Sequence, residues 1–163
     1  MTTADPTQQS LWGPVWRLLR SFDNDIARLY VERGIEGVRP RFVGPLIRLG
    51  REGPMTIRQL ADSLQVTHSG MSQTVSTLRQ EGLVRTEPGA DARTQVVTLT
   101  DQGRQLIPLL EAEWRATERT LAELEAEIPY PLSQVVRDLE AALARRPFFE
   151  RLTTNLEREL AER

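Results

Sequence analysis

Residues 55–104 have the sequence MTIRQLADSLQVTHSGMSQTVSTLRQEGLVRTEPGADARTQVVTLTDQGR. Two short helical patterns with a tight turn between them lead directly into two β-rich runs, residues 83–87 and 95–99. A polar loop that contains Gly89 joins these two runs, as expected of a hairpin. This order predicts a helix-turn-helix followed by a strand, a projecting loop and a second strand. We expect the rest of the chain to be organised around this module.

Each of the two helical patterns has a start signal and one apolar face. Thr56 and Gln59 have the spacing of a capping box at the start of the first helix. Thr67 can cap the second helix through its hydroxyl group, and Gly82 can end it. The apolar residues recur at three- and four-residue spacings, and they are Ile57, Leu60, Ala61 and Leu64 in the first helix and Met71, Val75 and Leu78 in the second.

The other face of the second helix carries mainly small side chains that form hydrogen bonds. Such a helix fits the major groove of DNA, where the planar amide of Gln73 can pair with an adenine and serine hydroxyls can reach phosphates or base edges. The alternative for Gln73 is an ordinary solvated helix surface, and the alternative for His68 is an exposed side chain of the capping turn. The predicted DNA contacts of this helix and its cap are Thr67, His68, Ser69, Ser72, Gln73, Ser76 and Arg79.

The order of these motifs resembles that of the MarR family of bacterial winged helix-turn-helix transcription regulators. The resemblance rests on LADSLQVTHSGMSQTVSTLRQEGLV at residues 60–84, on Asp91-Ala92-Arg93 in the loop, and on LTDQG at residues 99–103. It extends from residue 17 to residue 110. We expect the loop to be a DNA-contacting wing in which Asp91 orients the guanidinium group of Arg93. The alternative is a surface ion pair, which contributes only ~0–1 kcal/mol.

We expect one domain, residues 10–163, after a disordered segment of residues 1–9. Residues 10–53 contain two helical patterns, residues 54–104 are the winged helix-turn-helix, and residues 105–163 contain three more helical patterns. Ser10 is the expected cap of the first helix, Pro40 the expected start of the second, and Thr100 the expected cap of the long helix after the wing.

The helices outside the winged helix-turn-helix have apolar stripes but no sheet to cover them. We expect helices of two chains to cover each other across a two-fold axis, and the family resemblance implies the same arrangement. An intramolecular bundle is the alternative. The predicted fold class is therefore mainly α with a small β-hairpin wing, as a winged helix-turn-helix plus N- and C-terminal dimerisation helices.

The composition excludes several classes of protein. The chain has no Cys and one His, which excludes disulfides, a thiol redox switch and a Cys-based zinc site, and we expect no metal and no cofactor. It has no run of ~18 apolar residues, no motif of an enzyme active site and no features of a secretory signal. We therefore expect a cytoplasmic protein that neither crosses a membrane nor acts as an enzyme.

The charge of the chain is not typical of a nucleic-acid binder. The net charge is −2, whereas such proteins often have a basic surface. The acidic excess lies in residues 105–163, and the second helix of the winged module carries His68 and Arg79 as its basic side chains. Each neutralised phosphate contributes about −0.9 to the slope of log affinity against log salt, so this helix predicts modest non-specific affinity.

The predicted function is a sequence-specific transcription regulator, a repressor that binds a palindromic operator in double-stranded DNA as a homodimer. The alternative is a winged-helix protein-interaction module with weak or lost DNA binding. The resemblance also implies a small aromatic or anionic effector between the dimer helices and the winged module. The alternative for the three Trp residues among the expected effector contacts is that they belong to the hydrophobic core. The residues expected to border the effector are Trp12, Trp16, Arg41, Phe42, Trp114 and Arg115.

Arg93→Ala should weaken binding more on an operator with A·T-rich flanks than on one with G·C-rich flanks, because narrow A·T-rich minor grooves concentrate negative potential. The salt slope should flatten by roughly one unit per subunit. Asp91→Ala should reproduce part of the loss, and the double variant should be no worse than Arg93→Ala alone. Binding titrations on both operators across a salt series check this. Unchanged affinity and slope would show that the wing does not contact DNA.

Overall fold

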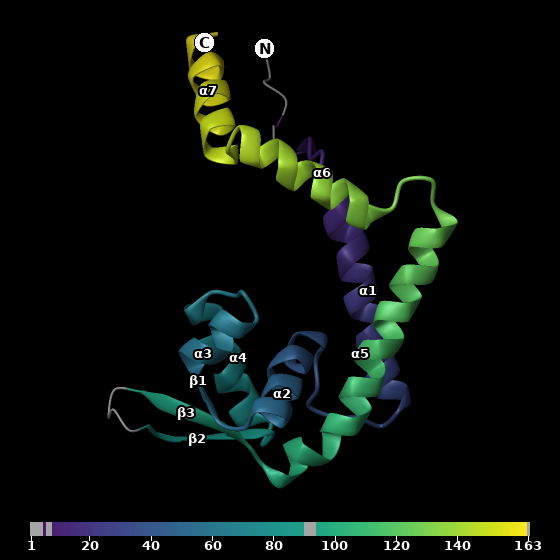
Figure 1. The fold of residues 1–163 in the computed structure, drawn as a ribbon, viewed down its shortest axis with the longest axis vertical. Coiled ribbons are helices and arrows are strands. Elements are labelled where there is room, and N and C mark those ends of the chain that lie inside the picture. Colours follow the sequence, from purple (N-terminus) through teal and green to yellow (C-terminus); the bar gives the residue numbers. More distant parts are fainter. Residues whose placement is uncertain (1–4, 6–7, 90–93, 163) are drawn as a thin grey trace. The chain divides into compact units, whose positions relative to one another are not determined.

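The computed structural model describes Asp5, residues 8–89 and residues 94–162. These residues form helices and a small antiparallel sheet, which confirms the predicted fold class (Figure 1). The elements in chain order are α1 (Gly13–Glu32), α2 (Pro40–Glu52), β1 (Met55–Thr56), α3 (Ile57–Ser63), α4 (His68–Gln80), β2 (Val84–Pro88), β3 (Gln95–Leu99), α5 (Asp101–Glu127), α6 (Leu132–Arg145) and α7 (Phe148–Ala161). The chain divides into two units, Met1–Trp114 and Arg115–Arg163. No described helix is long and apolar enough to cross a membrane.

The start of α1 differs from the prediction. Helix α1 begins at Gly13, and its N-cap residue Trp12 makes no capping hydrogen bond, so the predicted cap at Ser10 is wrong. Ser10 instead accepts the N–H of Gly13 through its backbone carbonyl at 3.1 Å. The predicted start of α2 at Pro40 is confirmed. The predicted disorder of residues 1–9 falls mostly outside the described residues and stays a prediction.

The sheet has the strand order β1-β3-β2, with both pairings antiparallel. Strand β1 was not predicted, because two residues are too few to show the alternation of a strand. In β1, Thr56 lies opposite Val96 of β3. Thr56 also completes the predicted capping box of α3, since its hydroxyl accepts the N–H of Gln59 at 3.2 Å and the Gln59 side chain accepts the N–H of Thr56 at 2.8 Å. The first turn of α3 is therefore fixed to the sheet.

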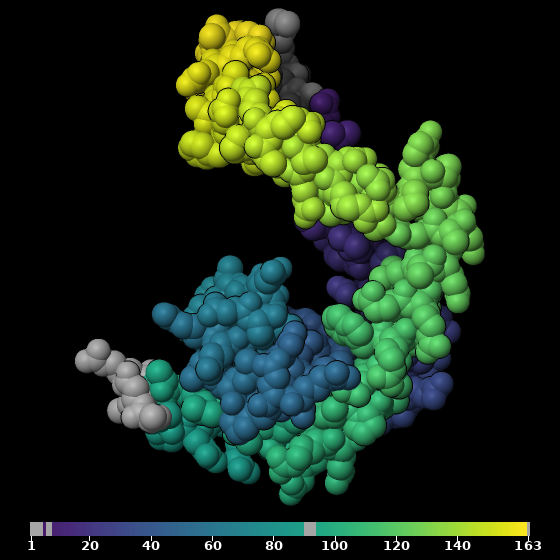
Figure 2. Space-filling view, viewed as in Figure 1, coloured from purple at the N-terminus to yellow at the C-terminus, as the bar shows by residue number. Residues whose placement is uncertain are grey.

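The core of the first unit lies among α2, α3, α4 and the sheet, and α1 and α5 contribute Tyr30 and Leu110 to it. The predicted apolar face of α4 is confirmed, and Ile57 and Leu64 of the α3 face pack at the edge of the core. In the space-filling view, the described parts of β2 and β3 extend beyond the body formed by these helices (Figure 2). The buried hydrophobic residues of this core are Tyr30, Val38, Phe42, Val43, Leu46, Leu49, Met55, Leu60, Ala61, Met71, Val75, Leu78, Leu83, Val84, Val97, Leu99 and Leu110.

Thr100 joins the end of α4 to the start of α5. Its hydroxyl donates to the Gly82 carbonyl at 2.7 Å and accepts the N–H of Gly103 at 3.1 Å, so it caps α5 as predicted. Its own N–H donates to the Leu83 carbonyl at 3.1 Å. Gly103 lies so close to that carbonyl that a Cβ atom on residue 103 would overlap it. Only glycine therefore fits at position 103 without moving α5 away from Leu83.

Polar contacts hold the helices of the second unit together. Glu125 of α5 accepts the N–H and the hydroxyl of Ser133 at 2.6 and 2.7 Å, and these hydrogen bonds hold the pKa of the Glu125 carboxyl below its usual value. Arg151 of α7 donates to the carbonyls of Ala142 and Arg146 at 3.0 and 2.9 Å, where α6 ends. Neither α6 nor α7 contains a buried residue.

Gly103→Ala should lower the free energy of unfolding by about 1–3 kcal/mol, because the added Cβ meets a backbone carbonyl rather than a flexible side chain. Gly44→Ala in α2 is the matched control, since its Cβ would lie 3.4 Å from Leu64, an ordinary van der Waals distance. This control should be as stable as the parent or up to about 1 kcal/mol more stable, because Ala favours a helix over Gly. Denaturant unfolding checks both variants, and equal stabilities would contradict the steric argument.

Candidate nucleic-acid interface

Helix α4 is fixed in the module by its cap and its buried face. The Thr67 hydroxyl accepts the N–H of Gly70 at 3.2 Å, which confirms the predicted cap. Met71 and Val75 are 3% and 2% exposed, so the helix cannot turn about its axis without losing its core contacts. The turn before α4 passes through Gln65, whose φ of 54° is uncommon for a residue other than glycine.

The structure places the predicted contact residues of α4 on its surface. Thr67, His68, Ser69, Gln73, Ser76 and Arg79 are exposed, and Ser72 is half-buried. The side chains of Gln73 and Ser76 have no hydrogen-bond partner among the described residues, so both keep their full capacity to bind a partner outside the chain. The Thr67 hydroxyl is instead occupied by capping, which makes it a structural residue of the site.

Two exposed residues of the helix-turn-helix are absent from the predicted set of DNA contacts. Gln80 ends α4 and follows Gln73 by seven residues, a spacing that returns to the same side of a helix. Arg58 lies on α3 and is also exposed. The helical spacing is a signal that could have identified Gln80, whereas Arg58 has no local motif that marks it.

The tip of the wing lies outside the described residues. Asp91 and Arg93 both belong to this segment, so their predicted DNA contact stays a prediction. Below the tip, the N–H of Gly89 donates to the Thr94 carbonyl at 2.9 Å and closes the described part of the ribbon. On β2, Arg85 forms an ion pair of 2.9 Å with Glu87, and both side chains are more than half exposed.

The residues expected to border an effector have different environments. Trp12, Trp16 and Trp114 are 48%, 59% and 48% exposed, so none of the three belongs to the core of a single chain. Phe42 is fully buried. Arg115 belongs to the second unit. The proposed role of the set stays a prediction.

Two arginines lie over the ring of Phe42 at the start of α2. The guanidinium carbons of Arg41 and Arg39 are 5.3 and 5.8 Å from the ring centroid, within the range of cation–π attraction. The first turn of α2 has no acidic residue, and the N-terminal end of a helix is itself positive. This end of α2 therefore carries positive charge that suits an anion. Arg41 belongs to the predicted effector set, whereas Arg39 does not.

A buried carboxylate joins α1 to α5 next to Trp114. The hydroxyl of Tyr30, at the end of α1, donates to Glu113 at 3.0 Å, and Glu113 is 8% exposed. Burial raises the pKa of Tyr30, and the adjacent Glu113 carboxylate raises it further. Tyr30 therefore stays protonated and keeps donating this hydrogen bond, which holds α1 against α5 in the first unit.

Comparisons with known proteins agree with this geometry. Residues 46–94 match the sequence model of the MarR family, which confirms the resemblance indicated by the motifs. The transcriptional regulator MOSR of M. tuberculosis, in a complex with DNA, is 25% identical with a TM-score of 0.59, and the match covers 85% of this chain and 99% of that chain. A comparison with curated protein sequences gives no match.

Two further solved structures share the fold. MepR of S. aureus, in a DNA complex, is 17% identical with a TM-score of 0.63, and the match covers 84% of this chain and 99% of that chain. PcaV of Streptomyces coelicolor, in complex with its natural ligand, is 19% identical with a TM-score of 0.59, and the match covers 90% of this chain and 99% of that chain. At these identities the likeness concerns the fold alone.

Proposed function

The winged helix-turn-helix of this chain is of the MarR type, and from this premise we propose that the protein is a sequence-specific transcription regulator that binds double-stranded DNA. One observation carries the proposal. The surface of α4 offers Gln73 and Ser76, which have no partner among the described residues, on a helix held rigidly by its buried face. In a major groove, these side chains would meet base edges and phosphates. The DNA complexes of MOSR and MepR support this proposal.

The exposed apolar residues of the second unit support a homodimer on a palindromic operator. Soluble monomers rarely expose a large contiguous apolar surface. A second copy of the chain would present the same apolar side chains to this surface. On α6 and α7 these residues are Leu132, Val135, Val136, Leu139, Leu143, Phe148, Phe149, Leu152, Leu156 and Leu160, which are 36–79% exposed.

We further propose that the regulator is a repressor released by a small aromatic or anionic molecule. The positive N-terminal end of α2, with Arg39 and Arg41 over Phe42, suits a carboxylate or similar anion. The half-exposed ring of Trp114 offers an aromatic surface on α5. The natural-ligand complex of PcaV supports an effector of some kind, since PcaV shares the fold.

A protein-interaction module is the second candidate function. The charge of α4 favours it, because His68 and Arg79 are the basic residues of this helix, and residues 105–163 are acidic. Selection of bound duplexes from a random pool separates the two functions. An enriched palindrome supports the regulator, and no enrichment supports the interaction module.

Gln73→Ala should reduce specificity while leaving non-specific binding nearly unchanged. The side chain is neutral and releases no counterions, whereas a bidentate amide contact to adenine provides about 1–3 kcal/mol of discrimination. Titrations of the selected duplex and a scrambled duplex at one salt concentration check this. Gln134→Ala on α6 is the matched control and should change neither affinity. An equal loss on both duplexes for Gln73→Ala would show that Gln73 does not contact a base.

Deletion of residues 147–163 should weaken a dimer that the full chain forms at micromolar concentration. Leu156→Glu should have the same effect, because it places a charge on the apolar face of α7. Arg158→Glu introduces the same residue on the opposite face of the helix and should leave the dimer intact. Sedimentation velocity measures these three variants and the full-length parent. A full-length chain that stays monomeric at this concentration would refute the dimer.

A further inference from the structure

The arginines of the winged module differ in whether they have a partner in their own chain. In the described part of this module, Arg85 forms an ion pair with Glu87, and Arg104 forms an ion pair with Asp101. Arg58 and Arg79 have no hydrogen-bonding or ionic partner among the described residues. Both are exposed, so their guanidinium groups are available to an anion outside the chain.

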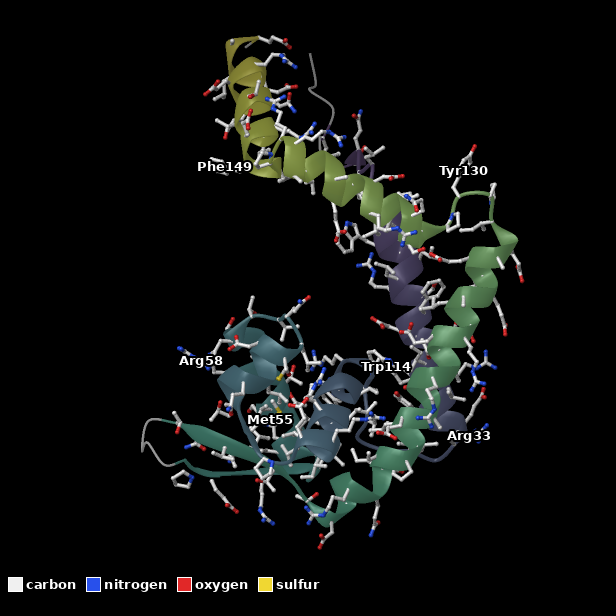
Figure 3. The ribbon with its side chains drawn as sticks, in the orientation of Figure 1. Arg33, Met55, Arg58, Trp114, Tyr130 and Phe149 are labelled. Carbon is white, nitrogen blue, oxygen red and sulfur yellow. The ribbon has the colours of Figure 1, made fainter. Side chains whose placement is uncertain are left out.

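Helix electrostatics explain the position of Arg79 but not that of Arg58. Arg79 lies in the last turn of α4, where a cation stabilises the negative end of a helix. Arg58 is the second residue of α3, and the positive N-terminal end of a helix disfavours a cation there. Arg58 therefore gives no electrostatic stability to α3, and its side chain extends outward from that helix (Figure 3).

Arg58 stands on a part of the module that is fixed relative to both DNA-binding elements. The Thr56–Gln59 capping box holds the turn that contains Arg58, and Thr56 pairs with Val96 of β3, near the base of the wing. Leu60, two residues after Arg58, is fully buried in the core that also contains α4. The backbone at Arg58 thus cannot move independently of α4 or of the wing.

We propose that Arg58 binds a phosphate of the DNA backbone and thereby sets the position of α4 in the major groove; this inference rests on the proposed DNA-binding function. In helix-turn-helix proteins the first helix crosses the backbone while the second lies in the groove, and Arg58 is the exposed, unpaired cation of that first helix. A guanidinium group can donate two hydrogen bonds to phosphate oxygens. Because every nucleotide has the same phosphate, Arg58 adds affinity and orientation without sequence preference.

The test compares Arg58→Gln, Arg58→Lys and the parent on the selected duplex and a scrambled duplex, by fluorescence anisotropy across a salt series. Arg58→Gln should weaken binding to both duplexes by the same factor, about threefold to tenfold, and should reduce the salt slope by about 0.9 per subunit. Arg58→Lys should keep the parental slope because it keeps the charge. Arg28→Gln removes an exposed arginine from α1 and should change neither quantity.

If Arg58 only stabilised the fold, its variants would show a different combination of melting temperature, affinity and salt slope. The melting temperature of Arg58→Gln should equal or exceed that of the parent, since the substitution removes a cation from the positive end of α3. A parental slope and affinity for Arg58→Gln, a loss confined to the selected duplex, or a loss accompanied by a lower melting temperature would each overturn the inference while leaving the proposed function intact. A parent that prefers no duplex would overturn the proposed function itself.

Discussion

The junction at Thr100 is the constraint on which the arrangement of the first unit depends. One hydroxyl group serves two helices there, since it donates to Gly82 just after α4 and accepts from Gly103 in the first turn of α5. The missing side chain of Gly103 lets that turn approach the Leu83 carbonyl. The direction in which α5 leaves the sheet is therefore set by the same atoms that end α4. If the first turn of α5 moved, the hydrogen bonds of Thr100 would move the end of α4 with it.

The two units differ in how they cover their apolar residues. In the first, residues such as Leu78 and Val97 are completely buried within one chain. In the second, Phe149 is 79% exposed, and contacts such as those of Arg151 with the end of α6 orient the apolar surfaces without burying them. Because burial contributes roughly 25 cal/mol per Å² of apolar surface, the proposed second copy would supply stability that α6 and α7 do not find in their own chain.

Local patterns predicted most of the first unit, and contacts distant in sequence account for what was missed. The Thr56–Gln59 capping box and the α4 stripe depend on residues within a few positions of one another, so the sequence displays them directly. Strand β1 exists only because Thr56 pairs with Val96, forty residues away. The positive φ of Gln65 belongs to the turn that ends α3, where the N–H of Val66 donates to the Ala61 carbonyl at 3.1 Å, and a glutamine does not mark such a turn as a glycine would. The surface residues of α4 were predictable for the same local reason, whereas Arg58 became evident only when its lack of a partner could be seen.

The weak positive charge of α4 has a consequence for how the proposed regulator would find its operator. A protein that displaces many counterions remains on non-specific DNA and slides along it. With Arg79 in the last turn and His68 in the first, α4 would contribute little to such attachment. Attachment to arbitrary sequence would depend instead on the contacts proposed for Arg58 and Arg93, which would also carry the salt dependence of the complex. The preference for the operator would come from the neutral contacts of α4, and this ratio of affinities would change little with ionic strength.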